Sequence, residues 1–173
     1  MNTIPTIIPK KAQDLFRKIE YNLDTELYFY GSVTRSDYIP NKSDIDVTIF
    51  SDNEYSDMNK LQHILAVKKS DFHKIVWKLN NRIIYGYKVK IKDINSEISI
   101  FNNDFKTQLL DEYTIPMRNK STFIFVLLYL LKLFYYQIPL LPTQTYVELK
   151  RYIMNVLMGK KESLYMLIKE NKV

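Results

Sequence analysis

Cysteine is absent from this chain of 173 residues, and only two histidines are present, His63 and His73. The lack of cysteine excludes disulfides, cysteine nucleophiles, and zinc–thiolate and iron–sulfur sites. With two histidines, which we interpret as ordinary surface or core residues, a multi-histidine transition-metal site is nearly excluded as well. Any metal would therefore be a hard cation held by carboxylates.

Glycine and proline are also scarce, with 3 and 6 residues, whereas 14% of the chain is aromatic and 46% hydrophobic. This composition excludes general disorder and a collagen-like structure. The length suits one domain, or one domain with a helical appendage. No secretory signal is visible at the N-terminus, so we expect a cytoplasmic protein.

The positive charge of the chain is unevenly distributed. The net charge is +6, from 25 basic and 19 acidic residues. Residues 1–104 carry 15 basic and 14 acidic side chains, whereas residues 105–173 carry 10 and 5. This local excess favours a polyanionic partner such as a phosphate or a nucleic acid, although solubility alone explains it equally well.

One apolar segment, residues 122–142, is nearly long enough to span a bilayer. Lys132 lies at its centre, where a charge costs about 2.5–3.5 kcal/mol on insertion scales, and Gln137 and Pro139 follow. A helix that is apolar on all sides fits a buried core equally well. We therefore expect a core helix and no membrane contact, and keep a membrane-associated protein as the less favoured alternative.

The hydrophobic periodicity predicts a mixed α/β part over residues 1–104 and a helical part over residues 105–173. We expect a mixed sheet of about five strands, with Trp77 in its core, flanked by helices. The expected strands are 26–30, 44–50, 72–79, 82–94 and 97–101. The expected helices are 9–22, 53–67, 105–113, 120–137, 143–158 and 161–170.

Two carboxylates lie on one face of the strand predicted over residues 44–50, DIDVTIF. Its strict alternation places Asp44 and Asp46 opposite the apolar residues. Their Cα atoms should lie about 6.5–7 Å apart. That spacing lets the pair bridge two cations held ~3.5–4 Å apart, as in phosphoryl or nucleotidyl transfer. Taken alone, such a pair is more often the solvated face of an edge strand.

A Gly-Ser turn precedes this pair by twelve residues. Gly31 stands where strand 26–30 must end, and a glycine lets the backbone approach a phosphate closely. Ser32 offers a hydroxyl and an N–H group to the same anion. The alternative is a simple structural turn, but Gly-Ser followed by the 11-residue loop 33–43 and then by D-I-D is far more specific than either motif alone.

The segment YGSVTRSDYIPNKSDIDVTIF, residues 30–50, resembles the signature of the polymerase-beta-like nucleotidyltransferase superfamily. The resemblance implies that Gly31 and Ser32 hold an incoming triphosphate and that Asp44 and Asp46 bind divalent metal.

The segment SEISIFNN, residues 96–103, resembles V-D-I-S-F-N-N of non-canonical poly(A) and poly(U) polymerases. It places Glu97 as the third carboxylate of the site, with Asp93 as the alternative. Arg35 and Lys42 could also touch phosphates, although exposed basic loop residues are usually just solvated.

Two further segments resemble the same branch of that superfamily. KTQLLDEY, residues 106–113, is similar to N-T-x-L-L-x-x-Y, and Tyr113 is a candidate for base stacking, with core packing as the alternative. FVLLYLLKLFYYQ, residues 125–137, is similar to an apolar helix whose lysine contacts triphosphate. Lys132 is that lysine, unless it merely extends toward solvent at a helix end.

Three residues depart from the pattern of the branch. Glu97 stands where Asp is usual, Lys106 replaces an Asn that helps to bind the nucleotide, and Phe134 replaces a Trp. The first change matters for metal geometry, because the carboxylate of Glu97 reaches one methylene further.

The resemblance implies a nucleotidyltransferase, with a palm-like domain over residues 1–104 and a helical subdomain over residues 105–173. Asp44, Asp46 and Glu97 would hold two Mg²⁺ or Mn²⁺ ions, and Glu97 would accept a proton as NMP passes from an NTP such as ATP to an acceptor hydroxyl. We favour template-independent addition to an RNA 3′ end, as in poly(A) polymerases. The alternatives are a minimal enzyme that modifies a protein or small molecule, and an inactive subunit.

Overall fold

The computed structural model describes residues 3–79, 82–118, 122–138, 140–158 and 165–167. Its helices are α1 (Lys10–Leu23), α2 (Glu54–Leu65), α3 (Lys106–Arg118), α4 (Thr122–Tyr136) and α5 (Thr143–Met158). Its strands are β1 (Leu27–Tyr30), β2 (Ile45–Ser51), β3 (His73–Leu79), β4 (Arg82–Ile91), β5 (Ser96–Asn102) and β6 (Tyr165–Leu167). The predicted elements before residue 159 are present, most of them with bounds within a few residues.

The strands form a single mixed sheet in the order β1-β2-β5-β4-β3-β6. Strands β2 and β5 pair in parallel, and the other neighbours pair antiparallel. The predicted α/β fold class is therefore confirmed, and the sheet has one strand more than the predicted five.

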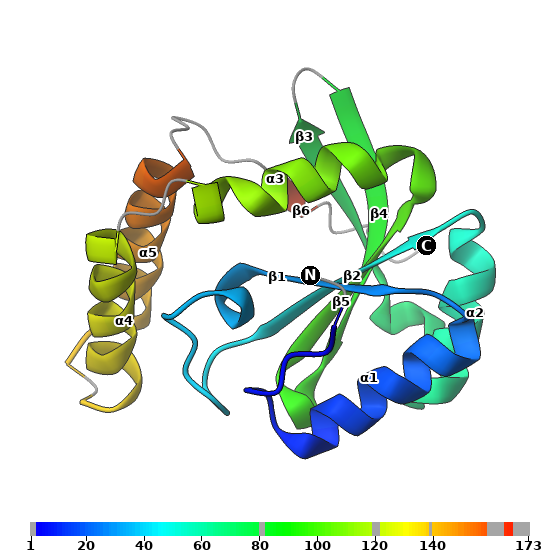
Figure 1. Cartoon of the computed structure of the whole chain (residues 1–173), viewed down its shortest axis with the longest axis horizontal. Coiled ribbons are helices and arrows are strands. Elements are labelled where there is room, and N and C mark those ends of the chain that lie inside the picture. The colour runs from blue at the N-terminus through cyan, green and yellow to red at the C-terminus, as the bar shows by residue number, and fades with distance from the viewer. Residues whose placement is uncertain (1–2, 80–81, 119–121, 139, 159–164, 168–173) are drawn as a thin grey trace.

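Each face of the sheet is covered by its own helices. Figure 1 shows α1 and α2 on one side of the sheet and α3 on the other. Because side chains alternate along a strand, Val47 and Ile98 pack with the α1–α2 cluster, while Phe50 and Phe101 pack with Leu109 of α3. Trp77 packs at the edge of this second cluster, in line with its predicted place in the sheet core.

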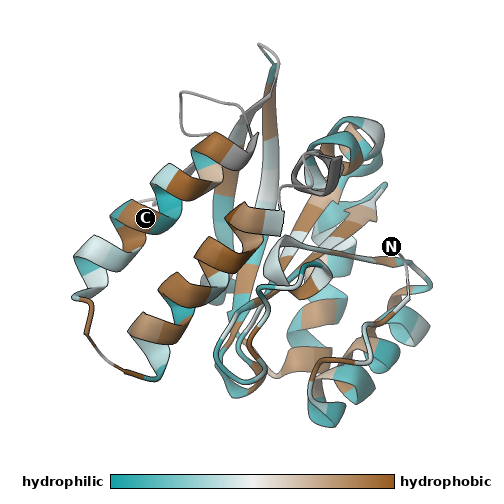
Figure 2. Ribbon diagram, turned by 60° about the vertical axis from the view of Figure 1, so that its left-hand side comes forward, coloured by the Kyte–Doolittle hydropathy of each residue, from teal (hydrophilic) through white to brown (hydrophobic). Residues whose placement is uncertain are grey.

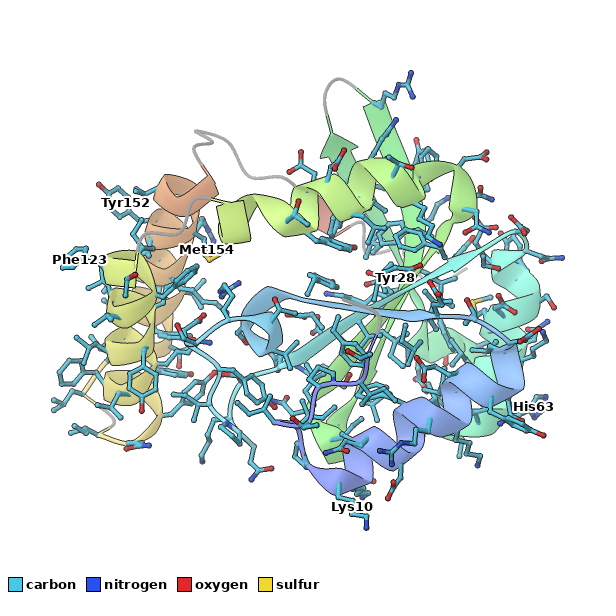
Figure 3. The ribbon with its side chains drawn as sticks, in the orientation of Figure 1. Lys10, Tyr28, His63, Phe123, Tyr152 and Met154 are labelled. Atoms are coloured by element: carbon cyan, nitrogen blue, oxygen red, sulfur yellow. The ribbon has the colours of Figure 1, made fainter. Side chains whose placement is uncertain are left out.

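Helices α4 and α5 form a third cluster, centred on Leu128, Leu131, Tyr146 and Ile153. They lie side by side next to one end of the sheet (Figure 1). Hydrophobic residues follow most of the length of α4 (Figure 2). Phe123 and Tyr152 are exposed on the outer side of this helix pair (Figure 3). Within the described residues, no helix combines the length and apolarity needed to cross a membrane.

The helix predicted over residues 161–170 is wrong at its centre. Tyr165–Leu167 forms strand β6, which pairs antiparallel with Ile75–Trp77 of β3. The open edge of β3 explains the difference, because its unpaired backbone groups accept another strand. The flanking residues of that prediction, 161–164 and 168–170, lie outside the described residues. The predicted division near residue 104 stays a prediction, and α3, just beyond it, packs on the sheet.

Candidate active site

A row of polar side chains crosses four strands on the face of the sheet that α3 covers. Tyr30 of β1 pairs with Asp46 of β2, Asp46 pairs with Glu97 of β5, and Glu97 pairs with Lys90 of β4. Residues directly opposite each other on paired strands point to the same face. The sheet therefore brings the predicted carboxylates Asp46 and Glu97 together, although they are far apart in sequence.

The apolar residues of β2 determine where Asp46, and Asp44 just before the strand, point. Ile45 and Val47 are fully buried against the α1–α2 cluster, so Asp44 and Asp46 must point to the opposite face. The side chain of Asp44 is 43% exposed, whereas Asp46 is only partly accessible. The prediction that both carboxylates share one face agrees with this register.

Gly31 follows β1 and is in close contact with Asp46. Its φ angle is +72°, in the region that favours glycine. A Cβ atom at this position would overlap Oδ2 of Asp46 and lie 3.3 Å from its Cγ. Gly31 and Ser32 begin a short 3-10 turn, Gly31–Thr34, in which the Thr34 hydroxyl donates a hydrogen bond to the Gly31 carbonyl at 3.0 Å. The predicted phosphate turn thus lies directly beside the carboxylates.

Glu97 is paired with two lysines that the sequence analysis did not single out. The ammonium group of Lys88 donates a hydrogen bond to Oε2 of Glu97, and Nζ of Lys90 lies 3.6 Å from Oε1. Nζ of Lys90 also lies 3.9 Å from Oδ1 of Asp44. Burial by itself raises the pKa of Glu97, but the hydrogen bond and charge of Lys88, with those of Lys90, outweigh it and hold that pKa below its ordinary value.

Asp46 has the opposite electrostatic environment. Burial, followed by the negative charge of Glu97, raises the pKa of Asp46 to about 7, against a smaller opposing effect of Lys88. Near neutral pH part of the metal-free carboxyl is therefore protonated. A bound cation would favour its charged form. The positive charge of Lys150 on α5 also lowers this pKa, so the helix pair contributes to the field at the site.

Asp44 and Asp46 have the chemistry that a hard divalent cation requires, since they supply carboxylate oxygens from one face of a single strand. Among the described residues, no three histidine or acidic side chains converge into a preformed metal cage. Both oxygens of the Glu97 carboxylate face lysines instead. The alternative third carboxylate, Asp93, is exposed and forms an ion pair with Lys11 at 3.5 Å.

Lys132 is buried beneath the loop that joins the Gly-Ser turn to β2. Its Nζ lies 2.8 Å from Oδ2 of Asp37 and 2.8 Å from the Asp37 carbonyl, and it donates to the Ser43 hydroxyl at 3.2 Å. Arg35 pairs with the same aspartate at 2.7 Å. Lys132 therefore fixes the loop that precedes Asp44. Its predicted triphosphate contact stays a prediction, as do those of Arg35 and of Lys42, which is exposed.

Tyr113 of α3 packs over the same face of the sheet. Its ring stacks on Tyr30 with centroids 4.2 Å apart, and its hydroxyl hydrogen-bonds with Thr48 at 2.7 Å. Burial raises the pKa of Tyr113, so its hydroxyl is neutral. These contacts agree with the core-packing alternative, and base stacking by Tyr113 stays a prediction.

Lys88 and Lys90 are the site residues that sequence reasoning missed. The signal was the alternation Y-K-V-K-I over residues 87–91, which places both lysines on one face of a strand. Their pairing with Glu97 depends on the β4–β5 register, which the sequence pattern does not give.

A family profile described as "Nucleotidyltransferase domain" matches residues 9–116, which is more than half of the chain. The matched segment contains the Gly-Ser turn, Asp44, Asp46 and Glu97. The chain therefore belongs to this nucleotidyltransferase family, and its resemblance to polymerase-beta-like nucleotidyltransferases is confirmed. No protein of curated function matches the chain.

Three solved structures are similar in part. A cytoplasmic RNA terminal U-transferase is 19% identical with a TM-score of 0.35, over 68% of this chain and 37% of that one. Cid1, described by its RNA terminal uridylyl transferase activity, is 17% identical with a TM-score of 0.30, over 69% of this chain and 40% of that one. A chain of the GLD-2/RNP-8 complex is 15% identical with a TM-score of 0.27, over 94% of this chain and 72% of that one. The chain thus covers well under half the length of the first two.

Proposed function

We propose that the chain is a divalent-metal-dependent nucleotidyltransferase that adds NMP from an NTP to the 3′ hydroxyl of RNA. The observation that carries this proposal is the packing of Gly31 against Asp46, beside Asp44 and Glu97. A turn that can cradle phosphate and a carboxylate pair suited to a cation meet here at one edge of the sheet.

Asp44 and Asp46 hold the cation in this proposal, and Gly31 and Ser32 orient the β- and γ-phosphates of the NTP. The cation, when bound, offsets the negative charge of the triphosphate and of the departing pyrophosphate. The acceptor oxygen forms a bond to the α-phosphorus, the bond from that phosphorus to its bridging oxygen breaks, and pyrophosphate leaves. Glu97, which its lysines keep ionised at neutral pH, is the nearby carboxylate that can accept the hydroxyl proton.

RNA as the acceptor is supported by charge and by sequence resemblance. Residues 105–173 carry a net charge of +5, and Lys150 of α5 is close enough to influence Asp46. Such an excess attracts a phosphate backbone, and this attraction weakens as salt rises. The segment SEISIFNN, which contains Glu97, resembles the branch that extends RNA 3′ ends. A protein or small-molecule acceptor remains the second candidate, because the matched domain alone does not specify the acceptor.

The test is transfer of label from each of four α-labelled NTPs to a short single-stranded RNA, with Mg²⁺ or Mn²⁺. The matched control is the double variant Asp44→Ala/Asp46→Ala. Extension by the wild type and none by the double variant would support the proposal, and the best NTP would define the enzyme type. Metal-dependent NTP binding without extension would favour a protein or small-molecule acceptor. Absence of NTP binding would favour an inactive subunit.

A further inference from the structure

Both oxygens of the Glu97 carboxylate face an ammonium group. Lys88 pairs with Oε2, and Lys90 lies 3.6 Å from Oε1 and 3.9 Å from Oδ1 of Asp44. The side chains of Lys88 and Glu97 are only 27% and 22% exposed, so water screens this ion pair incompletely. Cations of the protein itself thus occupy the Glu97 side of the site.

The register of β4 determines this arrangement. Val89 is fully buried in the α1–α2 cluster, and Ile84 is fully buried on the opposite face. Because side chains alternate, Lys88 and Lys90 must point to the same face as Ile84, where Glu97 lies. A slip of one residue would bury both lysines in the core, which makes the slip costly.

The length of Glu97 suits this pairing. Lys88 is directly opposite Ser99, not Glu97, so the two groups meet across a diagonal of the β4–β5 pair. The extra methylene of glutamate, in place of the aspartate usual at this position, lengthens its reach toward the lysine.

Two ammonium groups together carry the charge of one divalent ion. A second divalent ion at Glu97 would have to displace Lys88 from a partly buried ion pair and would then face a like charge nearby. We propose that Lys88, assisted by Lys90, takes the place of a second divalent ion, so that this chain binds a single ion at Asp44 and Asp46. The inference rests on the proposed function, and it replaces the two ions expected from the sequence resemblance with one ion and two lysines.

The test counts Mn²⁺ ions by electron paramagnetic resonance, with an NTP analogue that has a non-hydrolysable α–β bridge. Two Mn²⁺ ions ~3.5–4 Å apart are magnetically coupled, whereas one ion gives an uncoupled spectrum. We expect an uncoupled spectrum from the wild type and a coupled one from Lys88→Met. Lys92→Gln removes an exposed lysine just beyond β4 and should match the wild type. A coupled wild-type spectrum, or an uncoupled one from Lys88→Met, would overturn the proposal.

A second measurement remains informative even where Lys88→Met does not fold. Glu97→Gln should leave the Kd for Mn²⁺ within about threefold of the wild-type value, because it removes a nearby charge that does not ligate the ion. Asp46→Asn should weaken binding at least about tenfold, because it removes a ligand. Equal weakening by the two variants would show that Glu97 also ligates the ion and would refute the proposal that the lysines take the place of a cation at Glu97. Wild-type protein that binds no Mn²⁺–nucleotide at all would instead contradict the proposed function.

Discussion

Replacing Asp46 with asparagine should stabilise the metal-free protein at neutral pH while it weakens metal binding at least about tenfold. Burial and the nearby Glu97 carboxylate raise the pKa of Asp46 to about 7, well above its ordinary value of 3.8. The fold therefore disfavours the charged form of this side chain. Asparagine is close to it in shape and carries no charge, so the variant avoids this penalty.

The size and the sign of the effect follow from this difference in pKa. A change from 3.8 in the unfolded chain to about 7 in the folded chain corresponds to about 4 kcal/mol. Partial exposure of the carboxyl to water reduces the expected gain to about 2–4 kcal/mol. The folded form binds the proton more tightly, so Asp46 has no destabilising effect below about pH 4. Its penalty grows as pH rises from about 4 to 7 and is complete above that.

The assay is urea denaturation with EDTA present, at pH 4, 5.5 and 7.5, with the exposed Asp93→Asn as the matched control. Wild type and Asp46→Asn should unfold with equal free energies at pH 4 and diverge as pH rises. At this chain length, each kcal/mol should also raise Tm by roughly 2–4 °C. Asp93→Asn should follow the wild type throughout. An Asp46→Asn variant that is no more stable than wild type at pH 7.5 would refute the reasoning.

Three other substitutions, the first with a matched control, test separate features of the site and the fold. Gly31→Ala should lower the free energy of unfolding by about 1–3 kcal/mol, because alanine is strained at the positive φ of this position, and it should abolish NTP binding by displacing the Asp46 carboxylate. Its control is Gly86→Ala, whose Cβ would lie 2.6 Å from the Ile100 carbonyl oxygen. This control should lower Tm without changing the NTP affinity of the folded molecules. Lys132→Met should lower the free energy of unfolding, measured by urea denaturation, by about 3–5 kcal/mol, because it breaks the buried ion pair with Asp37. Weaker NTP binding with unchanged stability would instead indicate that Lys132 contacts phosphate. Tyr113→Phe should lower the free energy of unfolding by about 0.5–1.5 kcal/mol, because it loses the hydrogen bond to Thr48, and it should leave the NTP affinity unchanged. A large loss of NTP affinity would contradict a packing role for Tyr113.

The elements of the fold were predictable where the local pattern determines the structure. Strict alternation over residues 44–50 gave the strand, its buried face and the common face of Asp44 and Asp46. Gly31 was recognisable because it stands where strand 26–30 must end, and the structure adds a positive φ angle that favours glycine there. These features depend on neighbours within a few residues, which a single sequence displays.

Contacts between distant segments were not predictable in the same way. The role of Lys132 depends on Asp37, 95 residues earlier, and the charge in an apolar helix indicated only that some partner was needed. The pairing of Lys88 with Glu97 depends on a strand register. Strand β6 forms because β3 offers an open edge, a condition that its own three residues do not reveal.

The most direct test of the candidate site is a crystal structure of the protein with Mn²⁺ and a non-hydrolysable NTP analogue, analysed by anomalous diffraction. We expect an anomalous peak between the carboxylates of Asp44 and Asp46, with the β- and γ-phosphates against the backbone of Gly31 and Ser32. Lys88 should still contact Glu97 in that complex. Nucleotide bound away from the Gly-Ser turn, or Mn²⁺ without ligands from β2, would contradict the assignment of this edge of the sheet as the active site.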